Sequence, residues 1–236
     1  MKAQSRNSPT THDATATTAR GNAEPLLFFK ANKAYGEFFQ WYPATLTVGK
    51  SEMSPIVGHP IDGGEPEVWN PIYFSYAEQF MMYCKAGTFR DTESQQQIMA
   101  TGDPKQQKAL ARATRGFQAS RWDEIMSAVV AAGNMAKFQQ NAHLKSLLPS
   151  TGDRVLAEAA SQDRVWGIGY TAEEVMAQQR NWGENRLGKG LMEVMKRLRE
   201  ELVAEQPDRE YYVRPTAGVG DEATIVGDHA KDTMHP

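Results

Sequence analysis

The sequence predicts an α+β fold in which helices dominate, built as a single compact multihelical domain with a small β-sheet. Three observations predict it. Apolar residues recur at helical spacing over most of residues 25–205, strand-like runs are few and short, and the chain has no internal repeat. With 236 residues in total, there is room for one generous domain.

The two ends of the chain differ in composition from its centre. Residues 1–24 contain no Val, Ile, Leu, Phe, Trp or Tyr and cannot bury enough apolar surface to offset the entropy of ordering, so we expect a disordered N-terminal tail. Residues 206–236 are rich in Gly, Pro and Asp and hold six acidic against three basic side chains. We expect them to form a flexible acidic C-terminal tail, which leaves residues 25–205 as the domain.

Helices are predicted from apolar spacing and from capping residues. Asp103 before Pro104 is typical of an N-cap followed by a first-turn proline, and Thr171 with Glu174 forms a capping-box pair. Leucines, Val194 and Met195 line one face of the last helix. The predicted helices cover residues 74–86, 91–100, 104–115, 120–148 with a break near 141, 171–179 and 187–202.

Strand candidates are confined to four short runs, which predict the small sheet. The segment from 49 to 70 carries several glycines and prolines and is expected to be a long loop. The four runs are Leu26–Phe29, Thr45–Val48, Ile72–Phe74 and Arg154–Glu158.

Charge and composition exclude several classes of function. The 26 basic and 29 acidic side chains give a net charge of −3, so the chain lacks the basic footprint of a protein that grips a nucleic-acid backbone. No apolar run is long enough to span a membrane, and the N-terminus does not read as a secretory signal. The single Cys84 excludes an intramolecular disulfide. We expect an intracellular protein, cytoplasmic, with a nuclear location as the alternative.

Histidine is too scarce for several common types of catalytic site. Of five histidines, His12, His229 and His235 lie near the termini, which leaves His59 and His143. A Cys/His metal site or a Ser-His-Asp triad would lack parts, so we expect no metal. Carboxylates and lysines are the expected carriers of any catalysis.

Three segments hold residues that a packed core does not need. Glu78 and Lys85 are seven apart, so they project from one stripe of a helix, although two surface charges would give the same spacing. Trp166, between Asp163 and a pair of glycines, suits stacking on a flat ligand, although it equally suits a loop packed by its tryptophan. Asn185 could cap the last helix or present its amide to a ligand.

Four ordered strings resemble one family, the NADAR domain (NAD- and ADP-ribose-associated). Residues 78–86, E-Q-F-M-M-Y-C-K-A, look like the family's E-Q-Y-M-x-x-x-K-A segment, and Phe117 to Trp122 matches its F-x-x-x-x-W spacing. The order continues with A-K-F-Q-Q-N at 136–141, D-R-V-W-G-I-G at 163–169 and N-R-L-G-K-G-L-M at 185–192.

The resemblance implies an N-glycosidase that needs no cofactor. Members of the family act on ribosylamine intermediates of riboflavin synthesis or remove ADP-ribose from guanine. We expect ADP-ribose or ADP-ribosylated guanosine nucleotides as the preferred partner, with single-stranded or modified nucleic acid as a further one. A module that binds ADP-ribose or NAD without cleaving it is the alternative from another class, although a pure reader has no need of both Glu78 and Lys85.

The resemblance also implies roles for individual residues. Lys85 is the expected nucleophile that forms a Schiff base at C1′, Glu78 the proton shuttle, and Asp163 the ribose anchor or second acid–base group. A second route uses a carboxylate to stabilise an oxocarbenium ion while another group protonates the departing amine. The substrate-binding residues implied are Tyr35, Phe38, Trp122, Trp166, Gly167, Gly169 and Asn185.

The early segment departs from the family pattern. It reads Y-G-E-F-F-Q-W at 35–41, where members of the family often have Y-G-x-F-S-N-F. Phe39 and Gln40 thus replace a small and an amide-bearing residue, which changes the expected contacts to base or ribose. The segment from 49 to 70 is also longer than in compact bacterial members. The identity of the substrate is therefore more open than the chemistry.

Overall fold

The computed structural model describes residues 24–61 and 71–205 of the chain. Almost all of the predicted N-terminal tail and the whole acidic C-terminal tail lie outside the described residues. The helices are α1 (Lys50–Val57), α2 (Ala77–Thr88), α3 (Thr92–Ala100), α4 (Pro104–Arg112), α5 (Ala119–Gln140), α6 (Ala142–Ser150) and α7 (Arg186–Ala204). Two 3-10 turns cover Gly36–Phe38 and Gln179–Asn181. Helices therefore dominate the described chain, as predicted.

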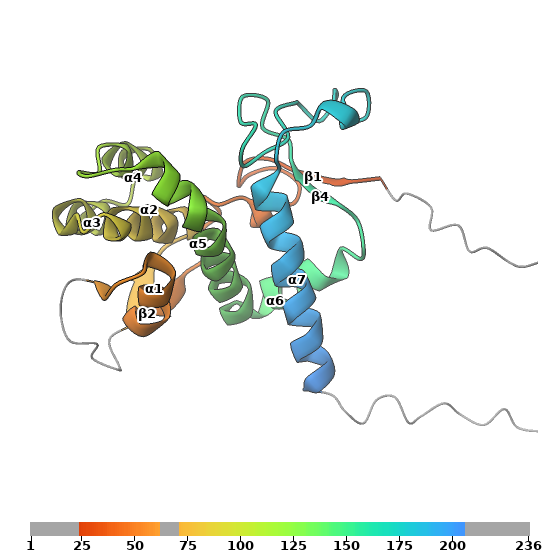
Figure 1. Ribbon diagram of the computed structural model, residues 1–236. Coiled ribbons are helices and arrows are strands. Elements are labelled where there is room, and N and C mark those ends of the chain that lie inside the picture. The colour runs from red at the N-terminus through yellow and green to blue at the C-terminus, as the bar shows by residue number, and fades with distance from the viewer. Residues whose placement is uncertain (1–23, 62–70, 206–236) are drawn as a thin grey trace, which may run out of the picture.

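The four predicted strands are present, but they form two sheets of two strands where one sheet was expected. Strand β1 (Leu26–Phe28) pairs in parallel with β4 (Leu156–Glu158). Strand β2 (Leu46–Gly49) pairs antiparallel with β3 (Pro71–Phe74). In Figure 1, β1 and β4 lie at the N-terminal end of α7, while β2 lies beside α1 on the far side of α5. The first sheet thus joins the beginning of the domain to the segment that leads into α7.

Two expectations from the sequence were wrong. Part of the segment expected as a loop forms α1, because Met53 and Val57, four residues apart, are both buried and outweigh the helix-breaking effect of Pro55. The predicted helix at 171–179 is a series of turns instead. There the indole N–H of Trp182 donates to the carbonyl of Val175 at 3.1 Å, so that a side chain from beyond the segment packs against these turns.

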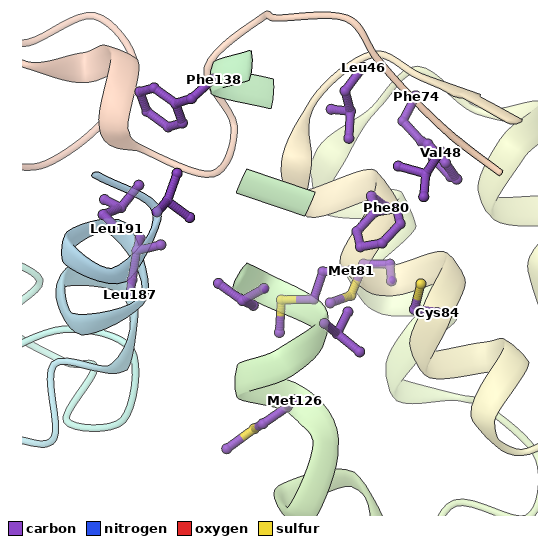
Figure 2. Packing of buried hydrophobic residues seen from close by; sticks show 14 of the residues in the cluster. Leu46, Val48, Phe74, Phe80, Met81, Cys84, Met126, Phe138, Leu187 and Leu191 are labelled. Atoms are coloured by element: carbon purple, nitrogen blue, oxygen red, sulfur yellow. The ribbon is translucent and has the colours of Figure 1, made fainter. Parts of the chain in front are cut away.

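The core lies where α2 and α5 pack together, with α7 covering the other side of α5. Figure 2 shows Phe80, Met81 and Cys84 on α2 and Met126 on α5 within one buried cluster. All four side chains are buried, and so are Leu187 and Leu191 on the inner face of α7. Burial of this kind contributes about 1.5–3 kcal/mol for each large apolar side chain. Of these packed helices, α2 carries Glu78 and Lys85 and α5 carries Trp122, which belong to the site described below.

Aspartates cap the N-terminal ends of α3 and α4, whereas α2, α5, α6 and α7 have no side-chain cap hydrogen bond. The Asp91 carboxylate accepts a hydrogen bond from Ser94 N–H at 3.3 Å, and Asp103 accepts one from Lys105 N–H at 3.0 Å. Asp91 also receives two hydrogen bonds from the Arg115 guanidinium, which hold the pKa of that carboxyl well below its usual range although burial opposes the shift. No helix in residues 24–61 or 71–205 is both long and apolar enough to cross a membrane.

Candidate active site

A cavity of about 720 Å³ opens between α2, α4, the start of α5 and the end of β4. Its lining includes Lys85 and two sets of charged residues. Glu78, Glu158 and Asp163 form what we call the acidic wall, and Lys30, Lys108 and Arg112 form what we call the cationic wall. Aromatic rings complete the enclosure, among them Phe39, Trp41, Trp122 and Trp166. The sequence-predicted residues Glu78, Lys85, Asp163, Trp122 and Trp166 are thus brought together.

Glu78 lies in the first turn of α2, and the backbone before that helix fixes its position. Its N–H donates to the carbonyl of Gln40 at 3.1 Å, and its side chain is hydrogen-bonded by Trp41. Only 6% of the residue is exposed. This burial raises the pKa of the Glu78 carboxyl, while the positive charge of Lys108 and the hydrogen bond from Trp41 oppose the rise. Glu78 is a carboxyl poised to exchange a proton.

Lys85 lies two turns further along α2 and reaches the same cavity, as the spacing predicted. Its Nζ is 4.3 Å from the centroid of the Phe117 ring and 6.0 Å from that of Trp122. It forms no ion pair with any carboxylate of the described residues, so Glu78 and Lys85 share the cavity without pairing. Burial lowers the pKa of the Lys85 ammonium, and the charges of Arg112 and Lys108 lower it further.

Asp163 shapes the turn that carries Trp166. Its Oδ1 accepts hydrogen bonds from the N–H groups of Val165 at 2.9 Å and Trp166 at 2.8 Å. Gly167 follows where the backbone approaches β4, since a Cβ there would lie 2.8 Å from the carbonyl oxygen of Glu158. Asp163 can therefore hold this turn through one oxygen and face the cavity with the other.

Several predicted substrate-binding residues do not line the cavity. Phe38 is fully buried in the core, and Tyr35 stacks on it with ring centroids 5.9 Å apart. Gly169 has a φ of 77°, a left-handed conformation that glycine adopts readily, beside Arg164. Gly167 packs against β4 as described. None of these four residues lines the cavity.

Asn185 connects β4, which carries Glu158, to the start of α7. Its Nδ2 donates to the carbonyl of Leu156 at 2.8 Å, and its Oδ1 accepts from the N–H of Glu158 at 3.3 Å. The residue is 5% exposed and does not line the cavity. The amide therefore holds the backbone of β4, and neither expected use of the side chain is observed, since it makes no capping hydrogen bond to α7 and does not line the cavity.

Glu158 is a functional candidate that sequence reasoning missed. It is 6% exposed, lines the cavity, and its Oε2 has no hydrogen-bond partner. Burial, and then the charges of Asp163 and Glu78, raise the pKa of its carboxyl to about 8, against the opposing charge of Lys108. The signal available in the sequence was a carboxylate ending a short, otherwise apolar strand candidate, L-A-E at 156–158.

The cationic wall was missed as well. Lys108 and Arg112 lie one turn apart on α4, so both face the cavity, and Lys30 joins them from the segment after β1. Lys108 Nζ is 3.9 Å from Oε1 of Glu78. In the part of the chain that the structure describes, no group of three or more His, Cys, Asp or Glu side chains is arranged to hold a metal ion.

Comparison with known proteins places the chain in a family. The NADAR domain matches residues 27–199. N-glycosidase R617 of Acanthamoeba polyphaga mimivirus is 39% identical over 120 residues, 50% of this chain and 71% of that protein. Protein irg-1 of Caenorhabditis elegans is 30% identical over 185 residues, 77% of this chain and 81% of that protein.

A solved structure shows the same fold. The NMR structure of the E. coli protein YbiA superposes with a TM-score of 0.54 at 22% sequence identity, covering 81% of this chain and 92% of that chain. The family match over residues 27–199 spans all the described helices and strands except the first residue of β1 and the last turn of α7. The chain is a member of the NADAR domain family.

Proposed function

We propose that this chain is an N-glycosidase that hydrolyses the C1′–N bond of a ribosylated base, with ADP-ribosylated guanine as its preferred substrate. The observation that carries the proposal is the convergence of Glu78, Lys85 and Asp163 on one cavity. The name of the relative R617, an N-glycosidase, supports the reaction class. The substrate is argued from the shape and charge of the cavity.

The size of the cavity and its aromatic side chains suit a nucleotide. Ligand pockets commonly measure about 300–1,000 Å³, and this one measures about 720 Å³. Trp41, Trp122 and Trp166 offer ring faces on which a base or a ribose can stack. The near-neutral domain favours free nucleotides or exposed bases over a duplex.

The cationic wall favours a substrate that carries phosphate. Lys108, Arg112 and Lys30 place three positive side chains around the cavity, and Arg112 has no ion pair with a carboxylate of the described residues. A guanidinium and two ammonium groups fit the oxygens of a diphosphate. A neutral riboside would leave Arg112 and Lys30 without a counter-charge among the described residues.

Lys85 can act as the nucleophile because its surroundings favour the neutral amine. After the ribose ring opens, the lone pair of Nζ forms a bond to C1′, and Glu78 accepts the surplus proton from Nζ. Expulsion of the base amine then gives a Schiff base between Lys85 and the sugar, which water hydrolyses. Asp163 holds the ribose hydroxyls in this account. The buried thiol of Cys84 fits an intracellular setting for such chemistry.

A second route leaves Lys85 without a covalent role. There a carboxylate stabilises an oxocarbenium ion and positions water, and the charge of Lys85 contributes only to binding. Loss of activity in Glu78→Gln combined with retained activity in Lys85→Ala would favour this second route. Loss in both variants supports the Schiff-base route.

The test of the proposed function is direct. The full chain is incubated with ADP-ribosylated guanosine, and free ADP-ribose and guanosine are measured by mass spectrometry, with Lys85→Ala as the control. We expect both products from the wild type and a loss of at least about 100-fold in the variant. Saturable binding of ADP-ribose without cleavage of the substrate would mean that the protein is a non-catalytic ADP-ribose-binding module. Cleavage of ribosylamine intermediates alone would retain the reaction and change the substrate.

A further inference from the structure

Glu158 is a buried carboxyl that the proposed chemistry has so far left without a task. It is the last residue of β4 and lies opposite Phe28 of β1 in the parallel register. Its side chain lines the cavity, 6% of the residue is exposed, and no hydrogen bond or ion pair of the described residues reaches its Oε2. A polar atom buried without a partner costs about 1–3 kcal/mol. A purely structural side chain at this position would avoid that cost.

The backbone around Glu158 is fixed from two sides. Its N–H donates to Asn185 Oδ1 at 3.3 Å. Its carbonyl accepts hydrogen bonds from the N–H groups of Ala160 and Ile168, both at 2.9 Å. Because the strand end and the following turn are tied together, the carboxyl has a defined place in the cavity wall. A group that transfers a proton needs this kind of fixed position.

Burial and two neighbouring carboxyls favour the protonated form of Glu158, against the opposing charge of Lys108. Glu78 approaches from α2, Asp163 from the turn after β4 and Lys108 from α4. Two of these three neighbours are carboxyls, and Lys108 lies 3.9 Å from an oxygen of Glu78. Burial and the like charges raise the pKa of Glu158 to about 8. Glu158 is therefore a protonated acid that lies near Glu78, the residue that serves as a base in the proposed mechanism.

We propose that Glu158 is the general acid that delivers a proton to the departing amine nitrogen of the substrate. This role rests on the proposed N-glycosidase function and adds a catalytic residue to it. The three carboxyls then divide the work: Glu78 exchanges the proton of Lys85, Asp163 holds the ribose and Glu158 protonates the leaving group.

The step balances as follows in the Schiff-base route. The C1′–N bond to the base breaks, and its electron pair stays on the departing nitrogen, which takes the proton from the Glu158 carboxyl. The lone pair of Lys85 Nζ forms the double bond to C1′, giving a protonated Schiff base, and Glu158 becomes a carboxylate. When water adds to C1′, Glu158 takes one water proton and returns to its acid form.

The first test reads the protonation of Glu158 without any substrate. The full chain is labelled with ¹³C at the glutamate side-chain carboxyl, and the Glu158 signal is assigned by its absence from Glu158→Gln. We expect that signal to titrate several pH units above an ordinary glutamate. A Glu158 carboxyl that is already ionised at pH 6 would overturn the proposal.

The second test reads the role in leaving-group departure. Wild type and Glu158→Gln, which keeps shape and loses the transferable proton, are compared on ADP-ribosylated aniline and on its 4-nitro counterpart, whose nitrogen leaves with less need of a proton. We expect the hydrolysis rate of the variant on the aniline substrate to fall about 100-fold or more, the usual scale of general acid catalysis. On the nitro substrate, the fold-loss in rate should be at least about ten times smaller.

Two further results separate this role from the proposed function. Wild-type hydrolysis with an equal loss on both substrates in Glu158→Gln, or with no loss, would overturn the role of Glu158 and leave the N-glycosidase standing. A wild type that hydrolyses neither the arylamines nor ADP-ribosylated guanosine would overturn the proposed function and this role with it. Glu78→Gln serves as a reference, because its loss should be similar on both arylamines.

Discussion

Lys108 Nζ lies 3.9 Å from Oε1 of Glu78, whereas Lys85, two turns along the same helix as Glu78, makes no ion pair among the described residues. One lysine therefore acts on two groups of opposite charge. Its positive charge lowers the pKa of the buried Glu78 carboxyl and also lowers the pKa of the Lys85 ammonium. Both effects favour a carboxylate next to a free amine, which is the pair that nucleophilic attack requires.

Replacing Lys108 should therefore change the pH dependence of the reaction. In Lys108→Met the pKa of Lys85 rises, because one of the two like charges that lower it is gone. Less of the amine is neutral at pH 7, so we expect the acid limb of the kcat profile to move to higher pH. KM should also rise as a phosphate contact is lost. The measurement is kcat and KM against pH.

Lys105 supplies the matched control for that experiment. It lies on the same helix as Lys108, is exposed and does not line the cavity. Lys105→Met should leave the profile where it is. A Lys108→Met enzyme with an unchanged acid limb would contradict the electrostatic role.

Two glycines of α7 should respond in opposite directions to alanine. A Cβ at Gly188 would meet the carbonyl of Leu156 and the amide of Asn185, so Gly188→Ala forces β4 and α7 apart. We expect a loss of about 1–3 kcal/mol in the free energy of unfolding, the usual cost of overpacking. Activity should fall too, because Glu158 is held by the same contacts.

Gly190→Ala is the comparison for Gly188→Ala. The nearest atom to a Cβ at Gly190 is Val130 Cγ1 at 3.9 Å, which is ordinary contact. Alanine should stabilise the helix by about 0.5–1 kcal/mol. Urea unfolding of both variants measures the difference, and equal effects of the two changes would refute the close approach at Gly188.

Lys137 gives a prediction for stability against pH. It is fully buried in α5, donates to the carbonyl of Phe39 at 3.0 Å, and has a pKa lowered to about 7, chiefly by burial. The unfolded chain keeps an ordinary lysine, so it binds more protons than the folded one between pH 7 and about 10.4. Stability therefore rises with pH through that window.

Lys137→Met should remove this contribution. The free energy of unfolding of the wild type, relative to the variant, should increase by up to about 1.4 kcal/mol per pH unit between pH 8 and 10. Chemical unfolding at several pH values measures it. Curves that run parallel for the two proteins would show that Lys137 keeps its proton in the folded state.

The sequence predicted local structure well wherever periodicity and capping decide it. Glu78 and Lys85 share a face because α2 is a helix, and Asp103 caps α4 as its side chain allows. The helix expected after Thr171 is replaced by turns, against which Trp182, eleven residues on, places its indole with a hydrogen bond to the carbonyl of Val175. Such a contact depends on how the chain returns on itself, which residue spacing does not report.

The candidate site was predictable only where sequence motifs mark its residues. The four motif strings identify the walls that contain Glu78, Lys85 and Asp163, but Lys108 has the pattern of an ordinary polar helix face. Glu158 lies at the end of a strand of three residues. Its burial between other carboxyls follows from the pairing of β4 with β1 and from the Asn185 amide. These are long-range contacts, and only the folded chain brings them together.

Borohydride trapping tests most directly whether Lys85 attacks C1′ of the sugar. The full chain is incubated with ADP-ribosylated guanosine, reduced with sodium borohydride and mapped by peptide mass spectrometry, with Lys85→Arg as the control. We expect a sugar-derived mass on the peptide that contains Lys85. This added mass should depend on the presence of substrate and be absent from the variant. Turnover of the substrate with no adduct on Lys85 would contradict this role of Lys85.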